Sequence, residues 1–180
     1  MTPPNPAPKG DPPDWPLVER QAVRAVILDP QNRVLLLRCA AGDGGPPFWI
    51  TPGGGIDPGE SEDETLIREL REELGWSLDP TNLGPCIWTR THTFPWPPKG
   101  VRLKQHERYR LCRPTDAQPV LEHHRTPDEV QVLSGHRWWS ADDIERASSE
   151  GERFAPRAFG QQLRVLISRG PPARPIDVGV

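Results

Sequence analysis

Residues 54–76 read GGIDPGESEDETLIRELREELGW, a bent glycine-containing loop that leads into a strongly patterned helix. Ser61 and Glu64 have the spacing of a capping box, in which each side chain bonds the backbone amide of the other residue. Gly75 is suited to end the helix, because glycine readily adopts the left-handed conformation found at helix C-termini. The sequence therefore predicts a helix over residues 61–75.

This predicted helix carries an apolar stripe and, beside it, a cluster of glutamates. A rotation of about 100° per residue aligns four apolar side chains toward the core, namely Leu66, Ile67, Leu70 and Leu74. Glu69, Glu72 and Glu73 share an adjacent arc about 100° wide. Carboxylates at this spacing repel one another, whereas oxygen ligands gathered on one face suit Mg²⁺ or Mn²⁺. A solvated face with ion pairs through Arg68 is the alternative interpretation of the helix alone.

The loop before the helix favours the metal-site interpretation. It contains Gly53, Gly54, Gly55 and Gly59, and glycines permit sharp bends and close approach of the backbone. A loop bent in this way is able to aim a backbone carbonyl at a metal ion held by the helix. Loop and helix together therefore indicate a functional site.

The spacing of these residues resembles a known family motif. The stretch is Gly54-x5-Glu60-x7-Arg68-Glu69-Leu70-x-Glu72-Glu73-x-Gly75-Trp76. It resembles the Nudix box, G-x5-E-x7-R-E-U-x-E-E-x-G-U, where U is a bulky apolar residue, and every specified position matches. The preceding Trp49-x-x-Pro52-Gly53 also looks like the usual lead-in of that family. The resemblance implies the Nudix fold, an α/β/α sandwich with a mixed β-sheet.

The resemblance also implies an activity and a set of site residues. Nudix proteins are typically Mg²⁺-dependent pyrophosphohydrolases, in which water attacks a phosphorus of a nucleoside diphosphate linked to another group X. The implied metal ligands are Glu72 and Glu73, with Glu69 as a ligand or base, Glu60 in support and the Gly53 carbonyl completing the set. Arg68 would orient a carboxylate. A non-catalytic nucleotide sensor or interaction module on the same fold is the main alternative, and an isomerase of isoprenoid diphosphates is a third.

A further carboxylate is expected outside the box. Glu107 stands in a Q-x-E pattern that resembles one found on a strand in many family members, which implies a catalytic role. Gln105, Glu107 and Tyr109 alternate along a predicted strand, so they point to one face. An exposed Glu107 paired with Arg108 or Arg110 is the alternative. His123 and His124 are weaker candidates in a predicted loop.

Basic and aromatic side chains elsewhere are candidates for substrate binding. Arg38 and Arg90, on predicted strands, are candidates to hold a phosphate, as is Arg24. Trp88 and Phe94, together with Trp96, are candidates to stack on a base. Surface exposure and core packing are the respective alternatives. No subfamily signature is present, so X is open between a nucleoside triphosphate, a nucleotide sugar and other classes.

The rest of the chain predicts a single domain between two tails. Residues 1–16 hold seven prolines and predict a disordered arm, residues 17–170 the folded domain, and residues 171–180 a flexible tail. Strands are predicted over 22–29 and 33–38 as a hairpin, over 48–50, over 86–94 and 101–113 as a second hairpin, and over 136–139. Further helices are predicted over 140–147, with Ser140 as N-cap, and over 156–168, with Pro156 at the first position.

Composition limits the partners and the location. A chain of 180 residues with 22 basic and 25 acidic side chains has a net charge of −3, which argues against a nucleic-acid-coating protein. No apolar run reaches the ~20 residues of a membrane helix, and no apolar signal-peptide region stands at the N-terminus. The three cysteines, Cys39, Cys86 and Cys112, have no metal-site spacing and predict reduced thiols. We expect a cytoplasmic protein with a small nucleotide substrate, and the resemblance adds a homodimer as an expectation.

Overall fold

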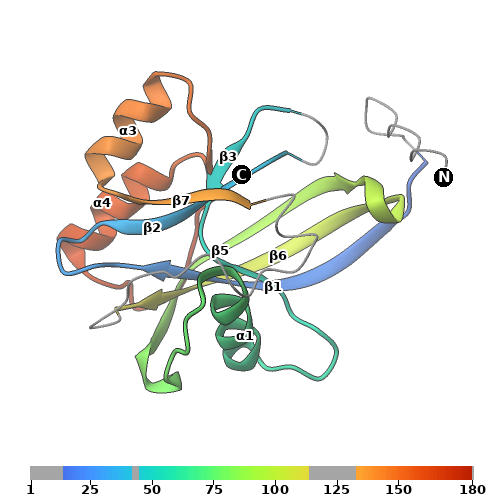
Figure 1. The fold of residues 1–180 in the computed structure, drawn as a ribbon, viewed down its shortest axis with the longest axis horizontal. Helices are drawn as coiled ribbons and strands as arrows, with labels where there is room; N and C mark the ends of the chain where they lie inside the picture. Colours follow the sequence, from blue (N-terminus) through green and yellow to red (C-terminus); the bar gives the residue numbers. More distant parts are fainter. Residues whose placement is uncertain (1–13, 42–44, 114–132, 180) are drawn as a thin grey trace.

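Two β-sheets form the middle layer of the fold, between helix α1 on one side and helices α3 and α4 on the other (Figure 1). The computed structural model describes residues 14–41, 45–113 and 133–179, so residues 1–13 of the expected arm and the candidates His123 and His124 lie outside the described residues. The helices are α1 (Glu62–Leu74), α3 (Ala141–Ser149) and α4 (Phe159–Arg169), and two short 3₁₀ turns are η1 (Pro80–Asn82) and η2 (Pro97–Lys99).

The larger sheet contains five strands in the order β4-β1-β6-β5-β9. These strands are β1 (Leu17–Ile27), β4 (Gly53–Gly55), β5 (Leu83–Trp96), β6 (Val101–Cys112) and β9 (Ile176–Asp177). Strand β1 runs parallel to β6 and antiparallel to β4, so the sheet is mixed, as the family resemblance implies.

The smaller sheet contains four strands in the order β7-β2-β3-β8. They are β2 (Val34–Cys39), β3 (Phe48–Ile50), β7 (Leu133–Trp139) and β8 (Phe154–Ala155). The predicted strands over 48–50 and 136–139 and the hairpin of β5 with β6 are confirmed. Strands β5 and β7 are longer than predicted, and β6 ends one residue earlier, at Cys112.

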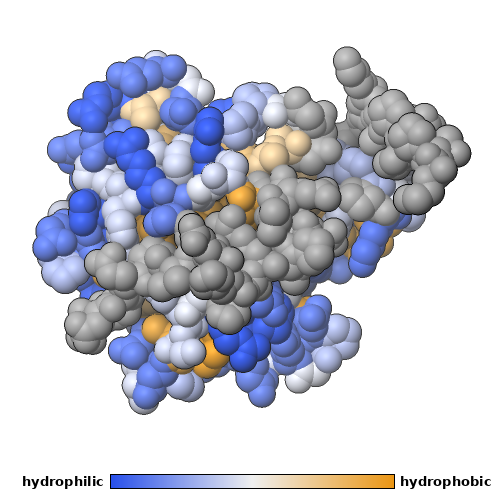
Figure 2. Space-filling model, in the orientation of Figure 1, coloured by the Kyte–Doolittle hydropathy of each residue, from blue (hydrophilic) through white to orange (hydrophobic). Residues whose placement is uncertain are grey.

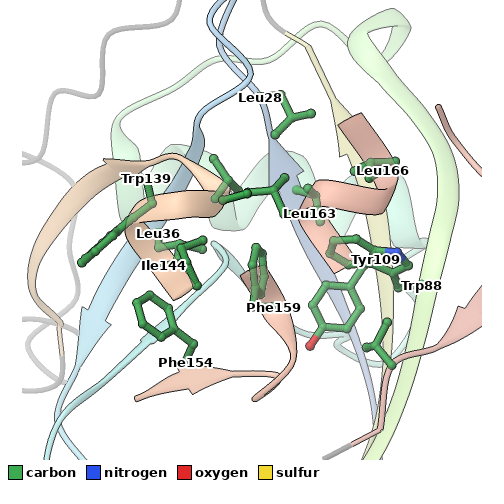
Figure 3. Close-up of a cluster of buried hydrophobic side chains, with 14 of the residues drawn as sticks. Leu28, Leu36, Trp88, Tyr109, Trp139, Ile144, Phe154, Phe159, Leu163 and Leu166 are labelled. Carbon is green, nitrogen blue, oxygen red and sulfur yellow. The ribbon is translucent and has the colours of Figure 1, made fainter. Parts of the chain in front are cut away.

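Two hydrophobic clusters join the sheets to the helices. On the α3 and α4 side, Trp88 and Tyr109 from the larger sheet pack with Phe159 (Figure 3). The Trp88 and Phe159 rings meet edge to face, with centroids 5.6 Å apart. On the other side, the fully buried leucines of α1 pack against β1 and β2. Burying each such leucine contributes about 1.5–3 kcal/mol, so α1 is held firmly on the sheet.

Helix α1 forms as the sequence predicts. The Ser61 side chain accepts a hydrogen bond from the Glu64 amide, and the Glu64 carboxylate accepts one from the Ser61 amide, which completes the capping box. Gly75 ends the helix in the left-handed conformation, at φ 69°. Ile67, expected on the core stripe, is only half-buried.

The predicted hairpin over 22–29 and 33–38 is wrong. Strands β1 and β2 belong to different sheets, and only an isolated bridge between Leu28 and Val34 links them. The turn is tight, since the Asp29 carboxylate accepts hydrogen bonds from the Gln31 and Arg33 amides. Both edges of β1 are already filled by β4 and β6, so β2 has no edge to join.

Two further predictions differ near the C-terminus. Helix α4 begins at Phe159, so Pro156 is not its first residue. Pro156 lies in the preceding turn, where its carbonyl accepts a hydrogen bond from the Phe159 amide. The flexible tail predicted over 171–180 contains strand β9, which pairs with β5, and Val178 is buried. Helix α3 has Ser140 as its N-cap, as predicted.

The cysteines and the helices agree with the composition. Cys39, Cys86 and Cys112 are not joined by disulfides, and burial raises the pKa of the Cys112 thiol to about 12. Among the described residues, no helix has the length and apolar character that a membrane crossing requires.

Candidate active site

The site is built around four glutamates, Glu60, Glu69, Glu72 and Glu73, which we call the glutamate cluster. Three of them lie on α1, and Glu60 lies just before the N-cap. The surface at this end of the molecule shows hydrophilic residues in blue beside hydrophobic ones in orange (Figure 2). The helical spacing predicted this common face, and the structure brings the four together around one arginine and one edge strand.

Arg68 links three members of the glutamate cluster. Its Nε and Nη2 atoms donate to the two oxygens of Glu60 at 2.8 and 2.9 Å. Its Nη1 atom donates to Glu69 at 2.9 Å and to Glu72 at 3.2 Å. Arg68 is therefore turned toward the carboxylates and holds them in place.

Strand β4 approaches the other side of the cluster closely. The Gly53 amide donates a hydrogen bond to Glu73 Oε2 at 2.8 Å, in a buried position. A Cβ atom on Gly54 would lie 2.3 Å from Glu69 Oε1, so this carboxylate rests directly against the backbone. Gly53 has a φ of 121°, a conformation that favours glycine. The glycines of the loop thus serve both backbone shape and close contact.

The members of the cluster differ in their electrostatic environment. Burial raises the pKa of Glu69 above its ordinary value, even though Arg68 opposes this shift. Hydrogen bonds from Arg68 and Thr65 lower the pKa of Glu60 to about 2. Glu69 is therefore the better proton acceptor of the two, whereas Glu60 stays ionised to a lower pH.

The donor set fits a hard divalent cation, with one adjustment. In the described ranges, no three acidic, histidine or cysteine side chains stand close enough to hold a metal ion without moving. The Arg68 guanidinium occupies the space among Glu60, Glu69 and Glu72, as a positive charge among carboxylates. Carboxylate oxygens and a backbone carbonyl are the ligands that Mg²⁺ prefers, so rotation of the Glu69 and Glu72 side chains away from Arg68 would provide such a site.

Glu107 lies at the centre of a buried hydrogen-bond network. Gln105 and Tyr109 donate to it at 2.9 and 2.7 Å, which confirms that these three residues share one face of β6. Arg24 and Arg90 also donate to it, at 3.1 and 3.2 Å. Burial by itself favours the neutral acid, yet the pKa of Glu107 lies well below its usual range because of these arginines and His92.

The exposed alternative for Glu107 is wrong. Its side chain has no exposed area, and Arg108 and Arg110 point to the opposite face of β6, where they pair with Glu62 and Asp63 at the start of α1. Arg24 connects the network to the glutamate cluster, because its Nη1 atom also donates to the Gly53 carbonyl. That carbonyl, an expected metal ligand, therefore already accepts a hydrogen bond.

The expected substrate-binding residues divide into two groups. Trp88 is 2 % exposed and packs in the core, so its interpretation as a base-stacking residue is wrong. Arg38 belongs to the smaller sheet, and no described contact joins it to the glutamate cluster. Arg90 lies beside Glu107, and Phe94 stacks on His92 with ring centroids 5.0 Å apart on the same face.

Sequence reasoning missed two members of this face, Arg20 and His92. Arg20 stands two positions before Ala22 and four before Arg24 on β1, so the strand's period of two was the signal that would have found it. Likewise His92 lies between Arg90 and Phe94 in the same alternation on β5. The face therefore carries three arginines and a row of aromatic rings.

Comparisons with known proteins agree with the motif. A family model described as NUDIX domain matches residues 18–158. An RNA pyrophosphohydrolase of Proteus mirabilis is 32 % identical over 171 residues, which cover 83 % of this chain and 90 % of the relative. An RNA pyrophosphohydrolase of Erythrobacter litoralis is 31 % identical over 66 % of this chain and 75 % of the relative. A nucleoside triphosphatase NudI of Klebsiella pneumoniae is 34 % identical, but the match spans only 58 % of that protein.

The fold also has solved counterparts. A MutT protein of Methanosarcina mazei superimposes with a TM-score of 0.60 over 87 % of this chain and 99 % of that chain, at 20 % sequence identity. At this identity the likeness concerns the arrangement of strands and helices. It agrees with the α/β/α layers and the mixed sheet described above.

Proposed function

The chain belongs to the Nudix hydrolase family, and on this premise we propose that it is a Mg²⁺-dependent pyrophosphohydrolase of a nucleotide substrate. The observation that carries the proposal is the glutamate cluster, held by Arg68 on one side and by the backbone of β4 on the other. All the box glutamates are present, which favours a hydrolase over the sensor alternative.

Glu72, Glu73 and Glu69 would hold the metal ion, with support from Glu60 and the Gly53 carbonyl. Bound Mg²⁺, or Mn²⁺ with its similar preference for oxygen ligands, neutralises phosphate charge and activates water. The Gly53 amide fixes Glu73, and Arg68 restrains the remaining carboxylates. The glycines of β4 leave room for these contacts.

The reaction requires a base near the attacked phosphorus. Water forms a bond to one phosphorus, the bond from that phosphorus to the bridging oxygen breaks, and the proton of water goes to a carboxylate. We assign this proton to Glu69, because a raised pKa makes a carboxylate a better base near neutral pH. We assign Glu107 a positioning role instead of the catalytic one, since its two oxygens already accept four hydrogen bonds.

The names of the relatives support a more specific substrate, one in which a chain of phosphates is attached to a nucleoside. The names of the relatives specify RNA pyrophosphohydrolase and nucleoside triphosphatase, so we propose a 5′-triphosphate as the substrate group. A cytoplasmic location and a homodimer stay predictions. The expectation that no nucleic acid is bound needs a direct test, because a 5′-triphosphorylated RNA end carries the same group as a free nucleotide.

A substrate panel tests the proposed function. We expect the purified protein with Mg²⁺ to turn over one class among nucleoside triphosphates, oxidised nucleotides, ADP-ribose, nucleotide sugars, dinucleoside polyphosphates, coenzyme A and 5′-triphosphorylated RNA. Chromatography of the phosphorylated products would identify both the class and the bond that breaks. A chain that turns over none of them with Mg²⁺ or Mn²⁺, yet shows ligand-induced thermal shifts, would support the sensor alternative instead.

Replacement of Gly54 by alanine should separate the site from the fold. The added Cβ would lie 2.3 Å from Glu69 Oε1, so the carboxylate must move, whereas its flexible side chain can do so without disturbing the core. We expect kcat to fall about tenfold or more, in line with the loss of one positioned catalytic group, with a melting temperature within a few degrees of the wild type. The control is Gly135→Ala, because a Cβ atom on Gly135 meets no atom within 4 Å, and it should change neither kcat nor the melting temperature. Gly59 is unsuitable as a control because its φ of 93° would strain an alanine.

A further inference from the structure

We propose that Arg20 binds a phosphate group of the substrate next to the glutamate cluster and sets the affinity for the polyphosphate chain. This inference rests on the proposed function, since it assigns a substrate contact to the same site. Arg20 lies on β1 and points to the face that carries Arg24, Arg90 and Glu107.

The three arginines of this face differ in how their charge is neutralised. Arg24 and Arg90 both donate to the buried Glu107 carboxylate, so one anion already serves these two cations. Within the described part of the chain, Arg20 makes neither a hydrogen bond nor an ion pair, and its recorded contact is with an aromatic ring. Among these three arginines of the described residues, Arg20 is therefore the one that pairs with no carboxylate, whereas the Nε atom of Arg90 is unbonded but buried beside Glu107.

The fold holds the Arg20 guanidinium in a defined place. A Cβ atom on Gly55 would lie 1.9 Å from Arg20 Nε and 2.0 Å from Nη2, so the guanidinium lies against the backbone of β4. The Trp96 ring comes from the end of β5, beyond β6 in the sheet, and the Arg20 Cζ atom lies over it, 5.1 Å from the ring centroid. Gly55 does not need positive φ, so the space taken by Arg20 is what excludes a side chain there.

This placement suits a phosphate. The N–H donors of a guanidinium point outward in its own plane, so a guanidinium whose face lies over an indole can still form paired hydrogen bonds to phosphate oxygens. Burial, and after it the charge of Arg24, lower the pKa of Arg20, whereas Glu69 and Asp57 oppose this shift, so these carboxylates compensate the Arg20 charge only in part. Gly55, which the guanidinium contacts, follows Gly54, which Glu69 contacts, so a phosphate beside the attacked one would bring negative charge next to Arg20.

Lys99 offers a matched control. Its Nζ atom lies 5.4 Å from the centroid of the same Trp96 ring, but the side chain is exposed at the tip of the β5–β6 hairpin. Arg20→Ala and Lys99→Ala therefore remove one positive charge each from the surroundings of one ring. A general electrostatic effect would make the two variants alike, whereas a specific guanidinium contact would affect only the first.

The test measures kcat and KM separately, and phosphate binding without turnover. For Arg20→Ala we expect KM to rise about 10- to 100-fold, as the loss of a charge-assisted hydrogen bond predicts, with kcat changed by less than about threefold because the contact exists before and during the reaction. Arg20→Lys should recover part of the loss. Gly55→Ala, which displaces the guanidinium, should behave as Arg20→Ala does, and Lys99→Ala should stay within about twofold of the wild type.

Calorimetric titration with inorganic tripolyphosphate and Mg²⁺ gives a readout that needs no turnover. We expect weaker binding by the same 10- to 100-fold in Arg20→Ala and unchanged binding in Lys99→Ala. Equal losses in both variants, or unchanged KM and tripolyphosphate binding in Arg20→Ala, would overturn the inference even if the enzyme is active. A wild type that binds tripolyphosphate through Arg20 but hydrolyses no nucleotide would overturn only the proposed function.

Discussion

Glu73→Gln should lower kcat about 1000-fold while the protein stays folded. Glu73 is the most deeply buried member of the glutamate cluster, and the Gly53 amide fixes it at 2.8 Å. Glutamine keeps the size of the side chain and an oxygen for that hydrogen bond, but it removes the charge that a divalent cation requires. Metal-assisted catalysis is worth several kcal/mol, and about 4 kcal/mol corresponds to a factor of about 1000.

The matched control is Glu62→Gln on the same helix. Glu62 pairs with Arg108 and Arg110 on the other face of β6, away from the glutamate cluster. Its half-exposed ion pairs should contribute no more than about 1 kcal/mol to stability, and kcat should stay within about twofold. Steady-state kinetics and thermal melts of both variants decide the matter. Equal activity of Glu73→Gln and the wild type would remove Glu73 from the metal site.

Glu107→Gln should cost about 3–5 kcal/mol of unfolding free energy, the usual result of removing one partner from a buried ion pair. Arg24 and Arg90 would both lose their carboxylate partner in a site from which water is excluded. Urea unfolding with linear extrapolation measures the change. Glu19→Gln is the control, because the Glu19 side chain is 62 % exposed and its pairing with Lys104 should contribute less than about 1 kcal/mol.

The stability difference between the wild type and Glu107→Gln should also depend on pH in a predictable direction. The pKa of Glu107 is lowered in the folded protein, so the ionised carboxylate stabilises the fold above its ordinary pKa of 4.5, and this contribution declines as the pH falls below that value. The stability difference between the wild type and Glu107→Gln should therefore be constant from pH 7 to about 5 and shrink at lower pH. A difference that grows on acidification would contradict the assignment of Glu107 as a buried anion.

The parts of the fold that were predictable from the sequence are those set by local chemistry. Helix α1 carries its own start signal in Ser61 and Glu64, its own stop signal in Gly75 and its own core stripe, so its position needed no partner. The β5–β6 hairpin was likewise predictable, since the turn joins two strands that are neighbours in the chain.

The wrong predictions concern contacts between residues that are far apart in the sequence, which local sequence patterns do not specify. The strands on either side of Asp29 look like a hairpin, but β1 finds its partners in β4 and β6, far along the chain. Trp88 follows the motif and resembles a stacking residue, yet α4 covers it because Phe159 packs against its ring. The alternation of β6 predicted the common face of Gln105, Glu107 and Tyr109, but two arginines from other strands decide how Glu107 is used.

The parallel pairing of β1 with β6 has a consequence for the order in which the protein matures. Residues 17–27 are synthesised before the other strands of this sheet, yet their partner strand ends at Cys112, 85 residues after Ile27, and strand β9 is the last of the sheet to be made. Since long-range pairing must await both partners and folds slowly, the loop and helix of the motif are synthesised before the sheet that anchors them exists. A nascent chain that ends between Trp76 and His106 therefore contains every residue of the motif without Glu107, the partner of the arginine that donates to the Gly53 carbonyl. Catalytic competence should arise only after β6 has been synthesised.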